Sequence, residues 1–87
     1  MGIPAKPELV DQLRDLFIDR LSLRTDPAEF KEDTSLFEDG IGLDSVDALD
    51  IAAALESEYG VTVEDEDIDN FGNLGVIADF VIERSKS

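Results

Sequence analysis

Apolar residues recur at spacings of three and four in three separate segments of this chain, with charged residues between them. The first segment runs from about Glu8 to Leu23, the second from about Asp44 to Tyr59, and the third from about Leu74 to Ser85. This spacing places apolar side chains along one face of a helix, whereas a half-buried strand would need strict alternation. The sequence therefore predicts an all-α fold.

Local signals mark the ends of these helices and of one shorter element. Pro7 suits the first turn of the first helix. Asp44 is a favoured N-cap for the second helix, and Gly60 suits a left-handed cap at its other end. Residues 61–63 are expected to be extended, and residues 64–70 are expected to form one or two turns. The predicted fold is a small bundle of three main helices plus one short helix.

The connection between the first two helices is a long first loop of about twenty residues. A loop of this length is uncommon in a compact domain unless its own side chains hold it against the core. Leu36 and Phe37 are the candidates for this role, with Phe30 as a third. At 87 residues the chain is expected to be a single domain. Its ends, residues 1–6 and 86–87, are expected to be flexible.

Acidic residues outnumber basic ones by 22 to 7, which gives a formal net charge of −15. Residues 32–83 contain 16 of the acidic side chains and neither Lys nor Arg. Nucleic acids and anionic membranes are not expected as partners, because both need a basic face. The charge instead favours partner proteins with Lys/Arg patches and a salt-sensitive association. An acidic face that only keeps the chain in solution is the alternative.

The sequence contains neither Cys nor His, and this absence excludes several chemistries. It excludes thiol nucleophiles, disulfides, Cys/His zinc sites and Ser–His catalysis. No metal site is predicted from the acidic run either, because an EF-hand loop starting at Asp65 would place Asn70 where Gly is required. No apolar run approaches the length of a membrane span, and no signal peptide opens the chain. The expected location is the cytoplasm.

The second helix carries two apolar stripes on nearly opposite sides. With about 100° of rotation per residue, one stripe is a normal core face. It consists of Ala48, Ile51, Ala52, Leu55 and Tyr59. The opposite stripe consists of Val46, Leu49 and Ala53, flanked by Asp47, Asp50 and Glu56. Periodicity alone leaves open whether the bundle buries both stripes or whether the second is an exposed docking surface.

The segment Gly42-Leu43-Asp44-Ser45-Val46 puts a Ser hydroxyl in the first turn of this helix, just after a flexible Gly. Free backbone N–H groups and the positive end of the helix dipole would favour an anion there, such as a phosphodiester. The alternative is that Asp44 and Ser45 only cap the helix. The pentapeptide does not choose between the two interpretations.

A longer pattern resembles the acyl carrier protein family. It consists of Asp44-Ser45, then Asp47, and the helix end Leu55-Glu56-Ser57-Glu58-Tyr59-Gly60-Val61. The match extends upstream through residues 34–37 and 40–42, and downstream through residues 64–67 and the last helix. The resemblance therefore covers nearly the whole chain, and it implies an acyl-carrier-like bundle.

The resemblance also implies a cofactor and a role. Ser45 would receive 4′-phosphopantetheine from coenzyme A through a Mg²⁺-dependent phosphopantetheinyl transferase, which would recognise Asp44. The chain would then be a monomeric carrier rather than an enzyme. Acyltransferases, ketosynthases or related enzymes with basic patches would act on the acyl thioester.

The resemblance assigns two further groups of residues. The partner-docking residues would be Val46, Asp47, Leu49, Asp50, Ala53 and Glu56. The acyl chain would enter a pocket between the second helix and the last two, lined by Ile51, Leu55, Ile68, Phe71, Leu74, Ile77 and Val81. The alternative for each of these residues is that it is an ordinary core residue.

The pathway is left open by two small residues in the second helix. Ala52 and Ala53 stand where common fatty-acid carriers have bulkier apolar side chains. The carrier is therefore expected to serve fatty-acid, polyketide or related lipid synthesis, with a specialised pathway as one of the choices. An aminoacyl or peptidyl carrier is the alternative, and an unmodified acidic helical interaction module is a third interpretation.

Overall fold

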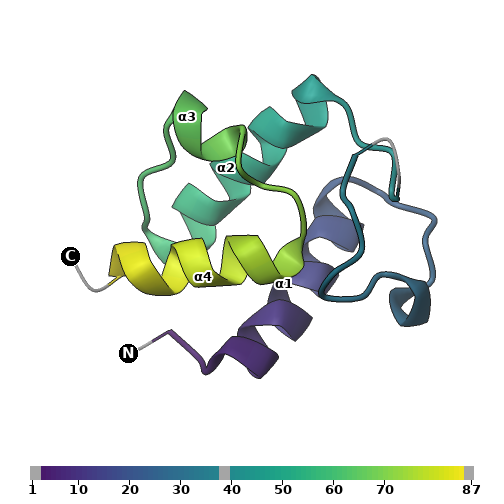
Figure 1. Cartoon of the computed structure of the whole chain (residues 1–87), viewed down its shortest axis with the longest axis horizontal. Coiled ribbons are helices and arrows are strands. Elements are labelled where there is room, and N and C mark those ends of the chain that lie inside the picture. The colour runs from purple at the N-terminus through teal and green to yellow at the C-terminus, as the bar shows by residue number, and fades with distance from the viewer. Residues whose placement is uncertain (1–2, 38–39, 86–87) are drawn as a thin grey trace.

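The computed structural model describes residues 3–37 and 40–85. Its elements are α1 (Lys6–Arg20), the 3-10 helix η1 (Pro27–Glu29), α2 (Ser45–Tyr59), α3 (Asp65–Ile68) and α4 (Leu74–Ser85) (Figure 1). No strand occurs among the described residues. The predicted all-α bundle of three main helices and one short helix is thus confirmed. Of the ends expected to be flexible, residues 1–2 and 86–87 lie outside the described residues.

Helix α1 ends at Arg20, three residues before the predicted end at about Leu23. The Leu21 N–H donates to Phe17 O at 2.9 Å and closes the last turn. Ser22 then adopts φ +53°, a left-handed conformation that few non-glycine residues take and that stops the helix. Leu23 lies beyond this break, yet its side chain is half-buried against the core. The predicted end of the first helix, at about Leu23, was therefore wrong by three residues.

The long first loop is held against the helices by apolar and polar contacts. Phe30 and Leu36 are fully buried and Phe37 is half-buried, so all three predicted residues face the interior at least in part. The Arg14 Nε–H donates to the Phe30 carbonyl and ties the loop to α1. The Leu36 N–H donates to Gly72 O at 3.0 Å and ties it to the segment before α4. The 3-10 helix η1 was not predicted from the sequence; the Asp26 side chain caps its first turn.

A tight turn at the end of this loop sets where the chain enters α2. The Ile41 N–H donates to Ser35 O, and the Leu43 N–H donates to Leu36 O, both at 2.9 Å. Gly40 is required inside the turn, because a Cβ at this position would lie 1.9 Å from Ser35 O. The turn brings residue 43 back over residue 36 and so places Asp44 and Ser45 at the edge of the bundle.

The core lies between α1, α2 and α4, and α3 packs beside α2 (Figure 1). Its fully buried side chains are all apolar, and they include Leu9, Leu13, Phe17, Ile51, Leu55, Leu74, Ile77 and Val81. Tyr59 is half-buried at the end of α2 and donates its hydroxyl to Gln12 Oε1 on α1 at 3.3 Å. Burial, and then the charge of Glu58, raises the pKa of the Tyr59 hydroxyl above its ordinary value.

Two Leu→Ala substitutions test whether the first loop is part of the core. Leu36→Ala should lower the free energy of unfolding by about 2–5 kcal/mol, because it leaves a cavity under the loop. Leu49→Ala is the matched control at a side chain that is 59% exposed, and it should cost about 0.5 kcal/mol or less. Urea denaturation followed by circular dichroism measures both. Equal costs would show that the loop contributes nothing to stability.

Candidate functional site

The start of α2 is closed by a reciprocal pair of carboxylates. The Asp44 Oδ1 atom accepts the N–H groups of Val46 at 3.0 Å and of Asp47 at 3.1 Å. In return, the Asp47 Oδ2 atom accepts the Asp44 N–H at 3.1 Å, which completes a capping box. Helix α2 therefore begins at Ser45, as the N-cap signal at Asp44 predicted.

This capping box corrects one expectation about the site. The sequence suggested that free N–H groups of the first turn would favour a phosphodiester beside Ser45. Two of those N–H groups already donate to the Asp44 carboxylate. An incoming anion would have to displace that carboxylate and would also meet the negative charge of Asp47. The helix terminus is therefore not a ready anion site, and the feature that makes Ser45 chemically available is exposure.

The Ser45 side chain is exposed on the first turn of α2, at the mouth of an open pocket. The pocket has a volume of about 520 Å³. Its apolar lining comes from Phe37, Leu43, Ala48, Leu49 and Ile68. Asp44, Asp65 and Asp69 also line it, so its wall combines apolar surface with carboxylates. A flexible group attached to Ser45 would thus have an apolar recess within immediate reach.

The second apolar stripe of α2 is exposed in the structure. Val46 is 64% exposed and Leu49 is 59% exposed, and Ala53 is also exposed. These are two of the three large hydrophobic side chains that are exposed among the described residues. A bundle that buried both stripes is therefore excluded, and the apolar strip is free to contact another molecule.

The three acidic side chains beside this strip differ in their surroundings. Asp47 is half-buried and belongs to the capping box. Glu56 is exposed, and its Oε2 atom accepts the Val63 N–H at 3.0 Å. Within the described part of the chain, Asp50 has no hydrogen bond or ion pair and points its charge at solvent. Asp50 is therefore the position where charge can be changed with the least effect on local structure.

The face of α2 that is buried differs from the predicted face: it is shifted around the helix axis toward the side that carries Asp47. Ala48, Ile51 and Leu55 are buried as expected. Ala52 and Tyr59 are only half-buried, whereas Ala54 is fully buried. Helical spacing places Ala54 between two Asp residues, so no apolar pattern marked it.

The residues predicted to line an acyl pocket fall into two places. Six of them are buried in the core: Ile51, Leu55, Phe71, Leu74, Ile77 and Val81. Ile68 is half-buried and lines the pocket beside Ser45. Phe37, Leu43, Asp65 and Asp69 line the same pocket and were not assigned to it from the sequence. Leu43 is close to Ser45 in the sequence, whereas Phe37, Asp65 and Asp69 reach the pocket only through the fold.

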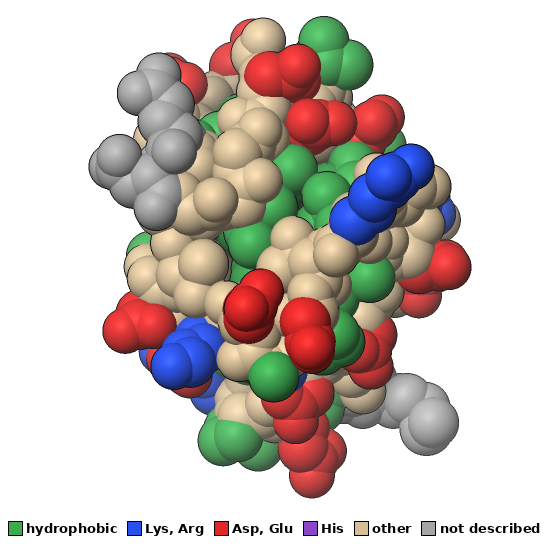
Figure 2. Space-filling model, turned by 90° about the vertical axis from the view of Figure 1, so that its right-hand side faces the viewer, with side chains coloured by type: hydrophobic (Ala, Val, Ile, Leu, Met, Phe, Trp, Pro, Cys, Tyr) green, Lys and Arg blue, Asp and Glu red, His purple; other side chains and the backbone are tan. Residues whose placement is uncertain are grey.

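The charges of the molecule are unevenly spread. Figure 2 shows the end of the molecule that carries the first loop, where hydrophobic side chains are visible in a hollow and both signs of charge occur. Of the Lys and Arg residues that the structure describes, five lie between residues 6 and 31, and Arg84 is the sixth. Helices α2 and α3 carry no basic side chain. No cluster of three potential metal ligands occurs among the described residues.

The capping box can be tested by two substitutions at Asp44. Asp44→Ala should lower the free energy of unfolding by about 0.5–2 kcal/mol, because two N–H groups lose their acceptor. Asp44→Ser should recover most of that loss, since a Ser hydroxyl also caps helices. Chemical denaturation of both variants gives the comparison. A stability for Asp44→Ala equal to that of the unsubstituted chain would contradict the structural role of the box.

Comparison with known proteins identifies the family. A family profile described as "Phosphopantetheine attachment site" matches residues 11–81. An acyl carrier protein of Clostridium perfringens is 30% identical over 78 residues, covering 90% of this chain and 99% of the relative. Acyl carrier protein 2, chloroplastic, of Spinacia oleracea is 38% identical over 88% of this chain and 57% of the relative. An acyl carrier protein of Petrotoga mobilis is 39% identical over 74% of this chain and 72% of the relative.

These matches confirm the resemblance drawn from the Asp44-Ser45 pattern and the expectation of a carrier rather than an enzyme. No helix in the described ranges is both long enough and apolar enough to cross a membrane. The chain belongs to the phosphopantetheine-attachment family of acyl carrier proteins.

Proposed function

We propose that this chain carries acyl intermediates as thioesters on a 4′-phosphopantetheine arm attached to the Ser45 hydroxyl. The observation that carries the proposal is the exposed Ser45 hydroxyl on the first turn of α2, beside an open apolar pocket. The bound arm supplies the thiol for the thioester, a group that the chain lacks because it contains no Cys. The residues around Ser45 fit this role by leaving its hydroxyl accessible to a transferase.

The capping box holds Ser45 in position for modification. Asp44 fixes the first turn of α2, so Ser45 stays at the edge of the bundle with its side chain outward. Asp44 is also the residue proposed to be recognised by the phosphopantetheinyl transferase. Because Asp44→Ser keeps the cap but removes the carboxylate, this variant separates the structural role from the recognition role.

Partner enzymes are proposed to dock on the exposed strip of α2. Val46, Leu49 and Ala53 offer apolar contact, and Asp47, Asp50 and Glu56 offer negative charge at its edges. An enzyme surface with an apolar groove and a Lys/Arg rim complements this face. The proposed partners are a phosphopantetheinyl transferase, acyltransferases, and ketosynthases or related enzymes. The strip starts next to Ser45, so a docked enzyme would face the arm.

The pocket beside Ser45 is proposed as the entrance for a carried acyl chain. Ile68 lines the pocket, and the other six predicted residues continue from it into the core between α2, α3 and α4. A chain that enters there would have to part packed core side chains. Sequestration of the cargo therefore depends on how easily α3 moves away from α2.

The pathway is proposed to be fatty-acid, polyketide or related lipid synthesis, and an aminoacyl or peptidyl carrier stays the alternative. Ala53 is exposed and gives the docking strip a shallow region beyond Leu49. A partner that fits this strip would present a larger apolar side chain opposite Ala53, which favours a dedicated set of enzymes. The cytoplasmic location and the monomeric state remain predictions.

Intact-mass measurement tests the proposed attachment. After incubation with coenzyme A, Mg²⁺ and a promiscuous phosphopantetheinyl transferase, the chain should gain the mass of one phosphopantetheine group. Ser45→Ala should gain nothing, whereas Ser57→Ala, at another exposed Ser of α2, should gain as much as the unsubstituted chain. An unchanged mass with several transferases would favour the unmodified interaction module.

Charge reversal at Asp50 tests the docking face. Asp50→Lys should weaken binding to the transferase by roughly 1 kcal/mol, or about fivefold in Kd, and reduce its salt dependence. Asp15→Lys makes the same change in net charge at an exposed position of α1 and should leave Kd nearly unchanged. Titrations at several salt concentrations measure both variants. If the two variants bind equally, docking depends on net charge and not on this face.

A further inference from the structure

The pocket beside Ser45 has one wall that the first loop holds in place. The Phe37 carbonyl accepts the N–H groups of Gly40 at 2.9 Å and of Gly42 at 3.0 Å. The Phe37 N–H donates to Ser35 Oγ at 3.3 Å. These hydrogen bonds fix the backbone at Phe37, whose half-buried side chain lines the pocket. The loop side of the pocket is therefore formed before any group enters.

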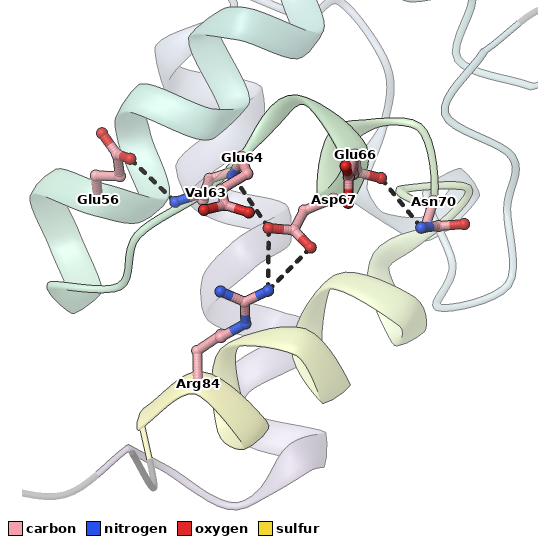
Figure 3. Close-up of polar contacts among 7 residues, drawn as sticks. All are labelled: Glu56, Val63, Glu64, Glu66, Asp67, Asn70 and Arg84. Carbon is pink, nitrogen blue, oxygen red and sulfur yellow. Dashed lines mark hydrogen bonds and ion pairs between the residues drawn. The ribbon is translucent and has the colours of Figure 1, made fainter.

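The opposite wall comes from α3 and is also held in place. The Arg84 Nη2 atom on α4 donates to both carboxylate oxygens of Asp67, at 3.0 and 3.2 Å (Figure 3). The same carboxylate accepts the Glu64 N–H at 3.0 Å, at the start of α3. Asp67 does not line the pocket, but these bonds hold its neighbour Ile68 at the pocket wall. Both walls are therefore in place in the free chain.

The lining combines apolar side chains with hydrogen-bond acceptors that are not in use. Phe37, Leu43 and Leu49 supply much of the apolar surface. Asp65 and Asp69 also line the pocket, and both are exposed. Within the part of the chain that the structure describes, neither of these two carboxylates has a hydrogen bond or an ion pair. A group that fits this lining has apolar surface, N–H or O–H donors and no negative charge.

The phosphopantetheine arm has this combination of groups in the part that follows its phosphate. A carbon with two methyl groups comes first, and a hydroxyl, two amides and the terminal thiol follow. The phosphate itself finds no place at the start of α2, because Asp44 already accepts the N–H groups of Val46 and Asp47. The carboxylates of the pocket lining also repel it. The phosphate therefore stays in water, whereas the methyl and N–H groups suit the pocket.

We propose that the pocket beside Ser45 binds the phosphopantetheine arm itself and that Phe37 is the residue that positions it. Phe37 and Leu43 pack against the two methyl groups of the arm. The carboxylates of Asp65 and Asp69 accept its amide N–H groups. Attachment at the pocket mouth gives the arm a high effective concentration, so a few weak contacts are enough to hold it. This inference rests on the proposed function, because it assumes an arm on Ser45.

The pocket accepts the arm without any change in the core. Its volume of about 520 Å³ lies within the range of small-molecule sites. Buried core side chains such as Ile51 and Leu55 stay packed when only the pocket is filled. An acyl chain that enters the core would instead have to part these side chains. The free carrier therefore holds an arm without cargo at no loss of core packing.

Proton NMR of the modified chain tests the role of Phe37. The ring current of Phe37 should displace the arm methyl resonances from their positions in free coenzyme A, and NOEs should join these methyl groups to Leu43. Phe37→Leu should lose the displacement but keep the NOEs, whereas Phe37→Ala should lose both. Phe80→Leu, at a half-buried ring that does not line the pocket, should change neither. Circular dichroism confirms that each variant is folded. Methyl resonances at their coenzyme A positions in the unsubstituted chain, or an unchanged displacement in Phe37→Leu, would overturn the proposal.

The arm amide resonances test the role of the two carboxylates. Asp65→Ala combined with Asp69→Ala should move these resonances to their positions in free coenzyme A. Asp15→Ala combined with Asp19→Ala removes the same charge from exposed positions of α1 and should leave them unchanged. Equal effects of the two pairs, or none from either, would overturn the proposed contacts. The mass of each sample shows separately whether the arm is attached. A normal mass gain with resonances like those of coenzyme A overturns this inference alone, whereas absence of the gain rejects the proposed function and this inference with it.

Discussion

The reciprocal hydrogen bonds between Asp44 and Asp47 determine how the rest of the site is arranged. They fix Ser45 as the first residue of α2, and packing against the neighbouring elements selects the face of that helix that is buried. With α2 begun at this residue, Ile51 and Leu55 are buried while Val46 and Leu49 are exposed. The attachment residue and the exposed strip therefore lie on the same helix, with Ser45 at its start and Val46 and Leu49 directly after it. The same bonds also use the N–H groups that would otherwise bind an anion.

Sequence signals predicted α2 and α4 closely because their ends depend on local chemistry. Asp44 caps α2 through its own first turn, and Gly60 takes the left-handed conformation, with φ +68°. The predicted end of α1 was wrong because the left-handed backbone at Ser22 stops the helix, and no side-chain pattern marks that break. The burial of Ala54 depends on how neighbouring elements pack around α2, and spacing along one helix does not report it.

In the candidate site, too, the sequence predicts the features that depend on local chemistry and misses those that depend on contacts between distant segments. Ser45 and the exposed strip follow from a local motif and a helical period, so the sequence predicts their positions. The occupied N–H groups were missed even though the Asp-x-x-Asp spacing of residues 44–47 is similar to a capping box. The contacts Glu56 to Val63 and Asp67 to Arg84 join segments that meet only after folding. These contacts give particular acidic residues a structural role. Composition alone does not distinguish such residues from acidic residues that only face solvent.

The central claim is that Ser45 carries a thioester-bound acyl group, and the chain purified from its own cells tests it most directly. Intact-mass measurement followed by fragmentation should find a phosphopantetheine group on Ser45, with an added acyl mass that neutral hydroxylamine removes by cleaving the thioester. The mass of the released group would also identify the cargo. A chain that carries no group at Ser45, or carries the group at another residue, would contradict the account.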